Sequence, residues 1–318
     1  MTATLTTPFG TLPSKDLLSI SQLGAGDIAT IFDAAAALKA DRNGYSELLR
    51  GKRLGMIFEK ESLRTRFTFD VGMQDLGGSA VFMDHRHVRL GTRESIRDMA
   101  KNLERWVHGI VARTYKHKAL EELAANCSIP VINGLSDFVH PCQALADFFT
   151  LTERWGDVKG KKVVYVGDGN NTCHSLVQVA TRLGAHITVC CPEGYEPNSR
   201  VIHEAMLAAR ETGSDVRIQN DPESGARDAD AIYTDVWASM GQEDETEERA
   251  AIFNDFRVDE EMMALAKPDA VFMHCLPAHR GQEVTSGVID SSASIVFDIA
   301  ENRLHVQKAI LALLLGKS

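Results

Sequence analysis

The sequence predicts an α/β protein built from two domains, each with a parallel sheet. Short apolar runs of strand length alternate with segments of helical periodicity along most of the chain, as in sheets whose parallel strands are connected by helices. The 318 residues are enough for two separate cores, and a polar stretch at 156–162 interrupts the alternation. We therefore expect a first domain over residues 1–155, a second over 156–298, and a C-terminal helix over 299–318 that packs back on the first.

The first half of the chain contains the predicted elements of one sheet and its covering helices. Strands are expected at 54–58, 79–83, 109–114 and 129–132. Helices are expected at 25–40, 94–107, 117–126 and 141–155, the last opening on Pro141, because a proline in the first turn gives up no hydrogen bond. A further helix should begin after Ser62, whose hydroxyl can cap it, and should stop at Gly77-Gly78.

The second half repeats this alternation. Strands are expected at 163–167, 186–191, 215–219, 231–236, 270–274 and 294–297. Helices are expected at 172–183, 199–212, 260–266 and 299–315, and the acidic, glycine-containing stretch 239–248 is expected to be a mobile loop.

Composition excludes several classes of protein. The hydrophobic content of 44% and charged content of 25% are those of a globular domain, and the net charge of -10 argues against non-specific binding of nucleic acid. No apolar run reaches the length of a membrane span, and residues 1–12 lack the pattern of a signal peptide. The six cysteines show no spacing typical of a disulfide framework or zinc site, so we expect reduced thiols and a cytoplasmic location.

The segment Ser62-Leu63-Arg64-Thr65-Arg66 predicts an anion site. It places two guanidinium groups at the start of a helix that follows a buried strand. A cation at this position destabilises the helix by about 0.3 to 1 kcal/mol, because it is repelled by the positive end of the helix dipole. A bound anion removes this cost, because it accepts hydrogen bonds from the guanidinium groups and from the free backbone N–H groups. The alternative is that both arginines are solvated first-turn residues.

Other polar residues follow predicted strands, where ligands bind in parallel α/β domains. These residues are Arg113, His140, Gln143, Asp168–Asn171, Asp235, Ser239, His274 and Cys275, with Arg303 on the closing helix. Singly, each is more often an ordinary structural residue; their shared position favours a common site. Two other interpretations stay open, a dinucleotide turn at Gly167–Thr172 with Glu193 as the ribose ligand, and a metal pair formed by His85 and His87.

Five separated segments resemble the signature motifs of the ornithine carbamoyltransferases, within the aspartate/ornithine carbamoyltransferase family. In this sequence they read SLRTR at 62–66, HPCQ at 140–143, DGNN at 168–171, DVWASMG at 235–241 and HCLP at 274–277. The resemblance covers residues 15–316 and implies a carbamoyl-phosphate domain and an amino-acid domain bridged by two helices. It also implies a homotrimer whose sites are completed by the 84–93 loop of a neighbouring subunit.

The same resemblance assigns roles to residues. Those expected to hold carbamoyl phosphate are Ser62, Leu63, Arg64, Thr65, Arg113, His140, Gln143, Cys275, Leu276 and Arg303. Those expected to hold ornithine are Asn171, Asp235, Ser239 and Met240. The catalytic residues would be Arg113, His140, Asp235 and Cys275, with no metal or cofactor required.

Two positions depart from the usual family pattern. Leu63 replaces a hydroxyl-bearing residue in the first motif, and Arg89 replaces His or Gln before Leu90-Gly91. Carbamoyltransferases acting on N-acetyl- or N-succinylornithine or another amine are therefore alternatives, although Ser239-Met240-Gly241 favours free ornithine. The more distant alternatives are an NAD(P)-dependent oxidoreductase and a carbamoyl-phosphate sensor without turnover.

Overall fold

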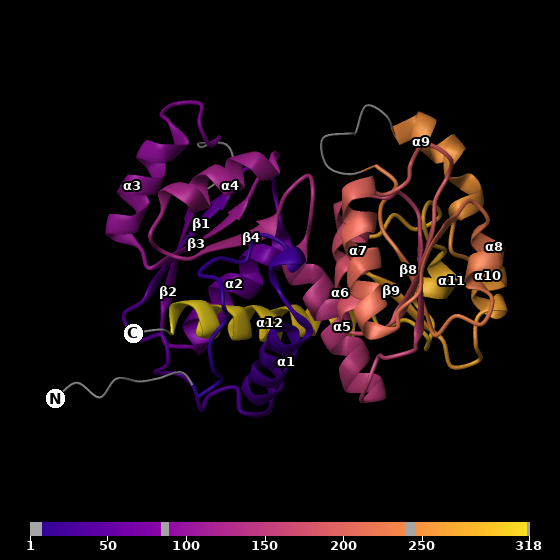
Figure 1. The fold of residues 1–318 in the computed structure, drawn as a ribbon, viewed down its shortest axis with the longest axis horizontal. Helices are drawn as coiled ribbons and strands as arrows, with labels where there is room; N and C mark the ends of the chain where they lie inside the picture. The colour runs from indigo at the N-terminus through magenta and orange to yellow at the C-terminus, as the bar shows by residue number, and fades with distance from the viewer. Residues whose placement is uncertain (1–7, 84–88, 239–245, 317–318) are drawn as a thin grey trace. The chain divides into compact units, whose positions relative to one another are not determined.

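The computed structural model describes residues 8–83, 89–238 and 246–316, and the chain divides into two compact units (Figure 1). The first contains the residues up to Ala146 and those from Glu301 onward, and the second is Asp147–Ala300. The chain passes between the units within two helices, α5 (Pro141–Trp155) and α12 (Val296–Leu315). The fold class predicted from the sequence, with its two bridging helices, is confirmed.

The sheet of the first unit has four parallel strands in the order β2-β1-β3-β4. These strands are β1 (Arg53–Phe58), β2 (Ser79–Met83), β3 (Gly109–Arg113) and β4 (Val131–Leu135). Phe58 and Arg113 are register partners at the carboxyl end of the sheet. At the far edge, Leu17 forms a bridge with Ile132, so that the N-terminal segment lies along β4.

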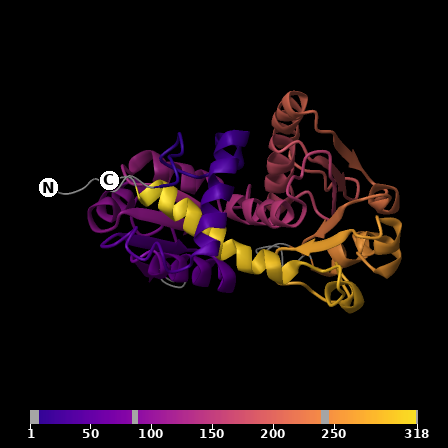
Figure 2. The ribbon, with the colours of Figure 1, turned by 90° about the horizontal axis from the view of Figure 1, so that it is seen from below.

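Helices cover both faces of this first sheet. They are α1 (Ala25–Ala40), α2 (Leu63–Asp75), α3 (Ile96–Trp106), α4 (His117–Asn126) and most of α12. Helices α3 and α4 pack on the face that carries Ile57, Ile110 and Ala112. Figures 1 and 2 show α12 beside α1 and α2, on the other side of the sheet from α3 and α4. The alternation of inward side chains along each strand thus explains why both sheet faces are apolar.

The second unit has five parallel strands in the order β7-β6-β5-β8-β9. The strands are β5 (Lys162–Val166), β6 (His186–Cys190), β7 (Val216–Gln219), β8 (Ala231–Thr234) and β9 (Val271–His274). The helices are the remainder of α5, α6 (Asn171–Arg182), α7 (Ser199–Thr212), α8 (Pro222–Ala226), α9 (Thr246–Ile252), α10 (Glu260–Leu265) and α11 (Ser286–Ile289). A short 3-10 turn at Asn254–Phe256 belongs to this unit, and another at Ile20–Gln22 belongs to the first. Every strand follows a helix or long turn, as parallel pairing requires.

The structure corrects several sequence predictions. The strand predicted at 294–297 is wrong: Ser294 makes only an isolated bridge to Phe272, and Val296 already begins α12. Its β-branched and aromatic residues suit either element, so composition could not separate them. The short helices α8, α9 and α11 were not predicted, because four to seven residues show too little periodicity.

Two further observations concern membrane-spanning helices and disulfide bonds. Among the residues that the structure describes, no helix combines the length and hydropathy needed to cross a bilayer. None of the six cysteines takes part in a disulfide.

Candidate active site

The amino end of α2 forms the first part of the candidate site. Ser62 is its N-cap, and the Thr65 N–H donates to the Ser62 hydroxyl oxygen at 3.2 Å, as predicted. The helix stops where expected, since the Gly78 N–H donates back to the Met73 carbonyl at 2.8 Å. First-turn N–H groups and the positive end of the dipole therefore face the carboxyl edge of the first sheet.

Three arginines surround one histidine in this unit. They come from different elements: Arg64 from α2, Arg113 from the end of β3 and Arg303 from α12. The histidine is His140, which directly precedes α5. Burial first, and then the positive charges of Arg303, Arg113 and Arg64, hold the pKa of His140 well below its usual range. The imidazole is therefore neutral at pH 7 and offers a single N–H donor.

Hydrogen bonds hold the side chain of Arg303 and the backbone of Arg113. The Arg303 guanidinium donates from Nη2 to the Thr65 hydroxyl at 2.6 Å. The Arg113 carbonyl accepts from the Glu59 N–H at 2.8 Å, which extends the β1–β3 pairing to the edge of the sheet. The side chains of Arg113 and Arg303 are 6% and 3% exposed, so an anion reaching them would be largely desolvated.

The first turn of α5 contributes two further residues of the predicted motif. Gln143 is fully buried, and its N–H donates to the His140 carbonyl at 3.2 Å. Burial raises the pKa of the neighbouring Cys142 thiol to about 12, and this thiol donates to the Asn133 carbonyl. Cys142 is thus a protonated packing residue and not a nucleophile.

Arg66, the second arginine of the sequence motif, is not among the arginines that act on His140. The Arg66 guanidinium lies over the Phe82 ring of β2, 3.8 Å from the ring centroid, and the side chain is exposed. The expectation that Arg64 and Arg66 both serve the anion site is therefore corrected, because Arg66 is engaged in a cation–π contact at the sheet edge. Leu63 is also exposed, so only its backbone can contribute.

In the second unit, Asp235 accepts hydrogen bonds from two neighbouring loops. The Cys275 thiol donates to Asp235 Oδ1 at 3.0 Å, and the Asn170 side-chain amide donates to Oδ2 at 3.1 Å. These residues follow β8, β9 and β5, three neighbouring strands of the sheet, of which β9 is at its edge. The geometry places a carboxylate and a thiol together, groups that accept hydrogen bonds from an amine or ammonium.

The predicted ligand Asn171 is the sequence neighbour of Asn170, the asparagine that contacts Asp235. Asn171 is the first residue of α6, and its side-chain oxygen accepts the Thr172 N–H at 3.0 Å. Asn170 is the N-cap, bonded also to Tyr165, and it is the residue that contacts Asp235. The sequence analysis included Asn170 in the candidate segment 168–171 but gave the ornithine role to Asn171 alone, although an asparagine before a helical segment is itself a capping signal.

Cys275 and Leu276 belong to the second unit and share a strained loop. Leu276 has φ of 57°, a left-handed conformation that a branched side chain rarely adopts. The Leu276 N–H donates to His274 Nδ1 at 2.8 Å, and His274 Nε2 lies 3.3 Å from the buried Glu283 carboxylate. Donor atoms of Asp235, His274 and Cys275 lie within 4.8 Å of one another, but both ring nitrogens of His274 already face protein groups.

A buried ion pair that the sequence analysis missed fastens the Asp235 loop. Arg249 of α9 donates to the Asp168 carboxylate and to the Trp237 carbonyl, both at 2.9 Å, and its guanidinium lies over Tyr195. Asp168 precedes α6 and Trp237 follows Asp235, so one guanidinium holds two loops that carry candidate residues. No local motif predicts this contact, because 81 residues separate its partners.

Some predicted residues lie outside the described part of the chain. They are Ser239, Met240, the proposed metal pair His85 and His87, and the first half of the 84–93 loop. Within the described remainder of that loop, the Leu90 N–H donates to Glu59 Oε1 at 2.7 Å.

The dinucleotide interpretation of Gly167–Thr172 does not fit the structure. The Gly169 N–H donates to the Tyr195 carbonyl at 2.9 Å, and a Cβ on Gly169 would lie 2.2 Å from the backbone nitrogen of Pro197. The protein's own 195–197 backbone therefore fills the space beside this glycine, where a pyrophosphate would need to approach.

The two sites together define a class of protein: a two-domain α/β enzyme with a buried cationic site suited to a phosphorylated substrate in one unit and a carboxylate–thiol site suited to an amine in the other. Family models agree with this division. The carbamoyl-P binding domain of aspartate/ornithine carbamoyltransferase matches residues 15–153, and the Asp/Orn binding domain matches residues 159–314. This chain belongs to the aspartate/ornithine carbamoyltransferase family.

Two curated relatives and two solved structures are similar to this chain over nearly its whole length. The chain is 54% identical to the ornithine carbamoyltransferase of Pyrococcus abyssi, over 96% of this chain and 97% of that protein. It is 53% identical to the anabolic ornithine carbamoyltransferase of Pyrococcus furiosus, over 96% and 98%. The solved structure of the enzyme from Pyrococcus furiosus superposes with a TM-score of 0.94, covering 97% and 99%. An N-acetyl-L-ornithine transcarbamylase mutant complexed with PALAO shares 33% identity with a TM-score of 0.86, over 95% and 100%.

Proposed function

We propose that this chain transfers the carbamoyl group of carbamoyl phosphate to the side-chain amine of L-ornithine, giving L-citrulline and phosphate. The observation that carries the proposal is the convergence of Arg64, Arg113 and Arg303 on a neutral His140 beside the capped end of α2. Family membership gives this anion site its substrate class, and relatives named for ornithine give the acceptor. The anabolic relative supports a biosynthetic role leading to arginine.

The phosphate of the first substrate binds at the amino end of α2. Ser62, the Leu63 N–H, Arg64 and Thr65 hold its oxygens, and Arg303 adds a charge through its contact with Thr65. Replacement of a hydroxyl by Leu63 is tolerated because the backbone N–H still donates. As the C–O bond breaks, the departing phosphate gains charge where the helix dipole and guanidinium groups stabilise it.

The carbamoyl group binds to Arg113, His140 and Gln143. Attack by the amine places negative charge on the carbonyl oxygen, and Arg113, Thr65 and the neutral His140 donate to it. Such preorganised donors lower the barrier by about 3 to 4 kcal/mol for each critical group. The departing phosphate takes the proton of the amine, so no covalent intermediate or metal is needed.

The ornithine site is built on Asn171, Asp235, Ser239 and Met240, with Cys275 and Leu276 along the path of the reacting amine. An ordinary primary amine of this kind is protonated at pH 7, and generating its neutral form costs about 4 kcal/mol. Asp235 orients the amino acid, and the Cys275 thiol on its Oδ1 lies beside the reacting amine. Water exclusion then favours the neutral nucleophile.

The assembly is a homotrimer in which neighbouring chains complete the sites. Strand β2 is the edge of its sheet, and Leu63, Phe67 and Val81 on α2 and β2 are 67%, 60% and 58% exposed. Large exposed apolar side chains on an edge strand, and on the helix that precedes it in the chain, support a contact with a second copy. Light scattering of the protein as it elutes from a size-exclusion column should give the mass of three chains, and a monomer at micromolar concentration would rule this assembly out.

We place the enzyme in the cytoplasm, in keeping with its free cysteines.

The test offers ornithine, N-acetylornithine, N-succinylornithine and putrescine with carbamoyl phosphate, and measures citrulline-type products and phosphate release. Strong preference for ornithine supports the proposal. Preference for an acylated amine would keep the anion site and reassign the residues around Asp235. Binding of carbamoyl phosphate without turnover of any amine would instead favour a sensor.

A further inference from the structure

The turn between β4 and His140, residues 136–139, is organised around the hydroxyl of Ser136. Its oxygen lies 3.3 Å from the Val139 N–H nitrogen, 3.4 Å from that of Phe138 and 3.3 Å from the Val139 carbonyl oxygen. The Ser136 N–H also donates to the Val139 carbonyl at 3.1 Å. The peptide that leads into His140 is therefore held on both sides, and Ser136 is fully buried.

A neighbouring side chain of β4 reinforces this turn. The buried Asn133 amide donates to the Leu18 carbonyl at 2.9 Å and lies 3.4 and 3.5 Å from the Ser136 hydroxyl and the Val139 carbonyl. Asn133 thus joins the turn to the N-terminal segment, which is itself paired with β4 through Leu17. The turn has little freedom to shift along the strand direction.

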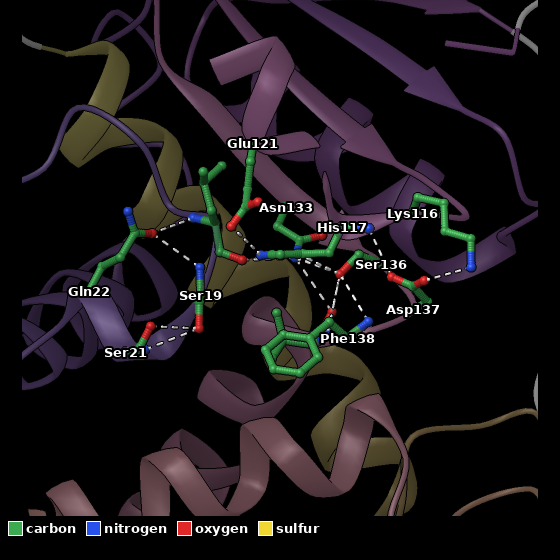
Figure 3. Close-up of polar contacts among 12 residues, drawn as sticks. Ser19, Ser21, Gln22, Lys116, His117, Glu121, Asn133, Ser136, Asp137 and Phe138 are labelled. Carbon is green, nitrogen blue, oxygen red and sulfur yellow. Dashed lines mark hydrogen bonds and ion pairs between the residues drawn. The ribbon is translucent and has the colours of Figure 1, made fainter. Parts of the chain in front are cut away.

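Helix α4 also fastens this turn, through His117 and Lys116 (Figure 3). The His117 ring nitrogen Nδ1 lies 2.9 Å from the Ser136 hydroxyl, and the His117 backbone N–H donates to Asp137 Oδ1 at 2.8 Å. Lys116 completes an ion pair with Asp137 at 3.2 Å. The N-cap position of α4 has no capping side chain of its own, so Asp137 supplies the cap from the turn.

These contacts join the two segments that carry Arg113 and His140. Residues 113–117 run from the end of β3 into α4, and residues 135–140 run from the end of β4 to α5. Between them, the Thr114 N–H donates to the Leu135 carbonyl at 2.9 Å, and the two contacts of His117 follow. The distance between Arg113 and His140 is therefore set by a continuous set of hydrogen bonds, none of which uses either side chain.

We propose that Ser136 and His117 are positioning residues that fix the imidazole of His140 relative to the guanidinium of Arg113. The inference rests on the proposed roles of these two groups as donors to the carbamoyl oxygen. Catalysis by preorganised donors is steeply sensitive to position, and a displacement of about 1 Å can cost about a hundredfold in rate. Residues that act only through His140 should change turnover far more than ornithine binding.

A neutral His117 ring can accept a hydrogen bond from the Ser136 hydroxyl, as the positioning role requires. Burial, which outweighs the opposing charges of Glu121 and Asp137, lowers the pKa of His117. Glu121 lies 3.7 Å from Nε2, and this end of α4 also carries the Lys116–Asp137 ion pair and the exposed Lys118. The neutral ring can accept a hydrogen bond from Ser136 at Nδ1, whereas a protonated ring could only donate.

The experiment compares Ser136→Ala and Ser136→Thr in the full chain, each with and without His140→Ala. We expect Ser136→Ala to lower kcat by ten- to a hundredfold with KM for ornithine within twofold, and Ser136→Thr to restore most of the loss. In the His140→Ala background, Ser136→Ala should cost less than threefold, because the group that it positions is gone. Ser21→Ala is the matched control, since Ser21 is an exposed serine in the same region whose hydroxyl donates to the Ser19 hydroxyl, and its loss should leave kcat unchanged (Figure 3).

Other outcomes distinguish failure of the positioning role of Ser136 from failure of the proposed catalytic role of His140. A Ser136→Ala enzyme within twofold of the parent, beside an inactive His140→Ala enzyme, overturns the positioning role but keeps the proposed function. Equal losses in both backgrounds also overturn it, since Ser136 would then act independently of His140. A His140→Ala enzyme within tenfold of the parent removes the proposed catalytic role of His140 itself. If Ser136→Ala does not fold, His117→Gln removes the ring but keeps the backbone contact, and we expect a three- to tenfold loss of kcat.

Discussion

The candidate sites of the two units carry opposite charge. In the first unit, Arg64, Arg113 and Arg303 gather around an imidazole that their charge helps to keep neutral. In the second, the Asp235 carboxylate is the charged centre, and it accepts hydrogen bonds from the Cys275 thiol and the Asn170 amide. Both sites lie at the carboxyl ends of parallel strands, so the same architecture presents them.

The difference shows how charge selects a substrate on a repeated fold. Cations brought together in a buried place repel one another until an anion binds, so phosphate should stabilise the first unit strongly. The Asp235 carboxylate of the second unit already accepts hydrogen bonds from two neutral donors, so it depends less on a bound cation than the arginines of the first unit depend on a bound anion. Substitutions that remove charge should therefore cost more in the first unit than in the second.

The largest effect is expected from Arg113→Ala. Loss of a buried guanidinium that we propose donates to the developing oxyanion should lower kcat/KM for carbamoyl phosphate by about a thousandfold, or about 4 kcal/mol. Steady-state kinetics at saturating ornithine measures this. Arg50→Ala is the control, because Arg50 is an exposed residue paired with Glu47 and should behave as the parent. A loss smaller than tenfold would remove Arg113 from the site.

A smaller effect is expected from Asp235→Asn in the second unit. The isosteric amide keeps the shape of the cluster but removes its charge, so kcat/KM for ornithine should fall by about a hundredfold, or about 2.8 kcal/mol. The affinity for phosphate, measured by calorimetry, should stay within twofold. Asp255→Asn, at an exposed 3-10 turn of the same unit, provides the matched control. Loss of phosphate affinity in Asp235→Asn would contradict the separation of the two sites.

Much of this architecture could be predicted because it is encoded locally. The helices α1, α4, α5 and α7 begin and end where the periodicity and capping residues place them, and Ser62 caps α2 as its position predicts. Strand β4 runs from Val131 to Leu135, past the end of the predicted range 129–132, because the polar Asn133 hid its continuation. The buried Asn133 is paired with residues far along the chain, and no local pattern contains that information.

The candidate sites could be located but not fully resolved from the sequence. Several of the predicted residues do follow strands in the structure, yet the contact to Asp235 comes from Asn170, one position before Asn171, to which the ornithine role was assigned. The Arg249–Asp168 pair and the His117–Ser136 contact depend on side chains 81 and 19 residues apart. Such pairs become visible only when the strands are ordered in space, whereas motifs report residues that are neighbours in sequence.

The last prediction concerns the charge state of His140 and has the smallest expected change. Because its pKa is lowered, the imidazole should show no titration between pH 8 and pH 6, where an ordinary histidine with a pKa of about 6.5 changes charge. Below about pH 6.5 the unfolded chain takes up a proton that the native chain does not. The stability contributed by the neutral form is thus complete above that pH and is lost as the pH falls through the lowered pKa.

NMR of the labelled histidines measures this directly, with His140→Asn to assign the resonance. Arg303→Met removes one of the cations that act on the ring, so the pKa of His140 should move up in that variant, although burial still holds it below its ordinary value. Lys39→Met, which removes a cation bonded to Asn302 on the same helix, should leave the resonance of His140 unchanged. A parent His140 that titrates with a midpoint near 6.5 would mean that neither burial nor the three cations lowers its pKa, and the contrast between the two sites would then rest on Asp235 alone.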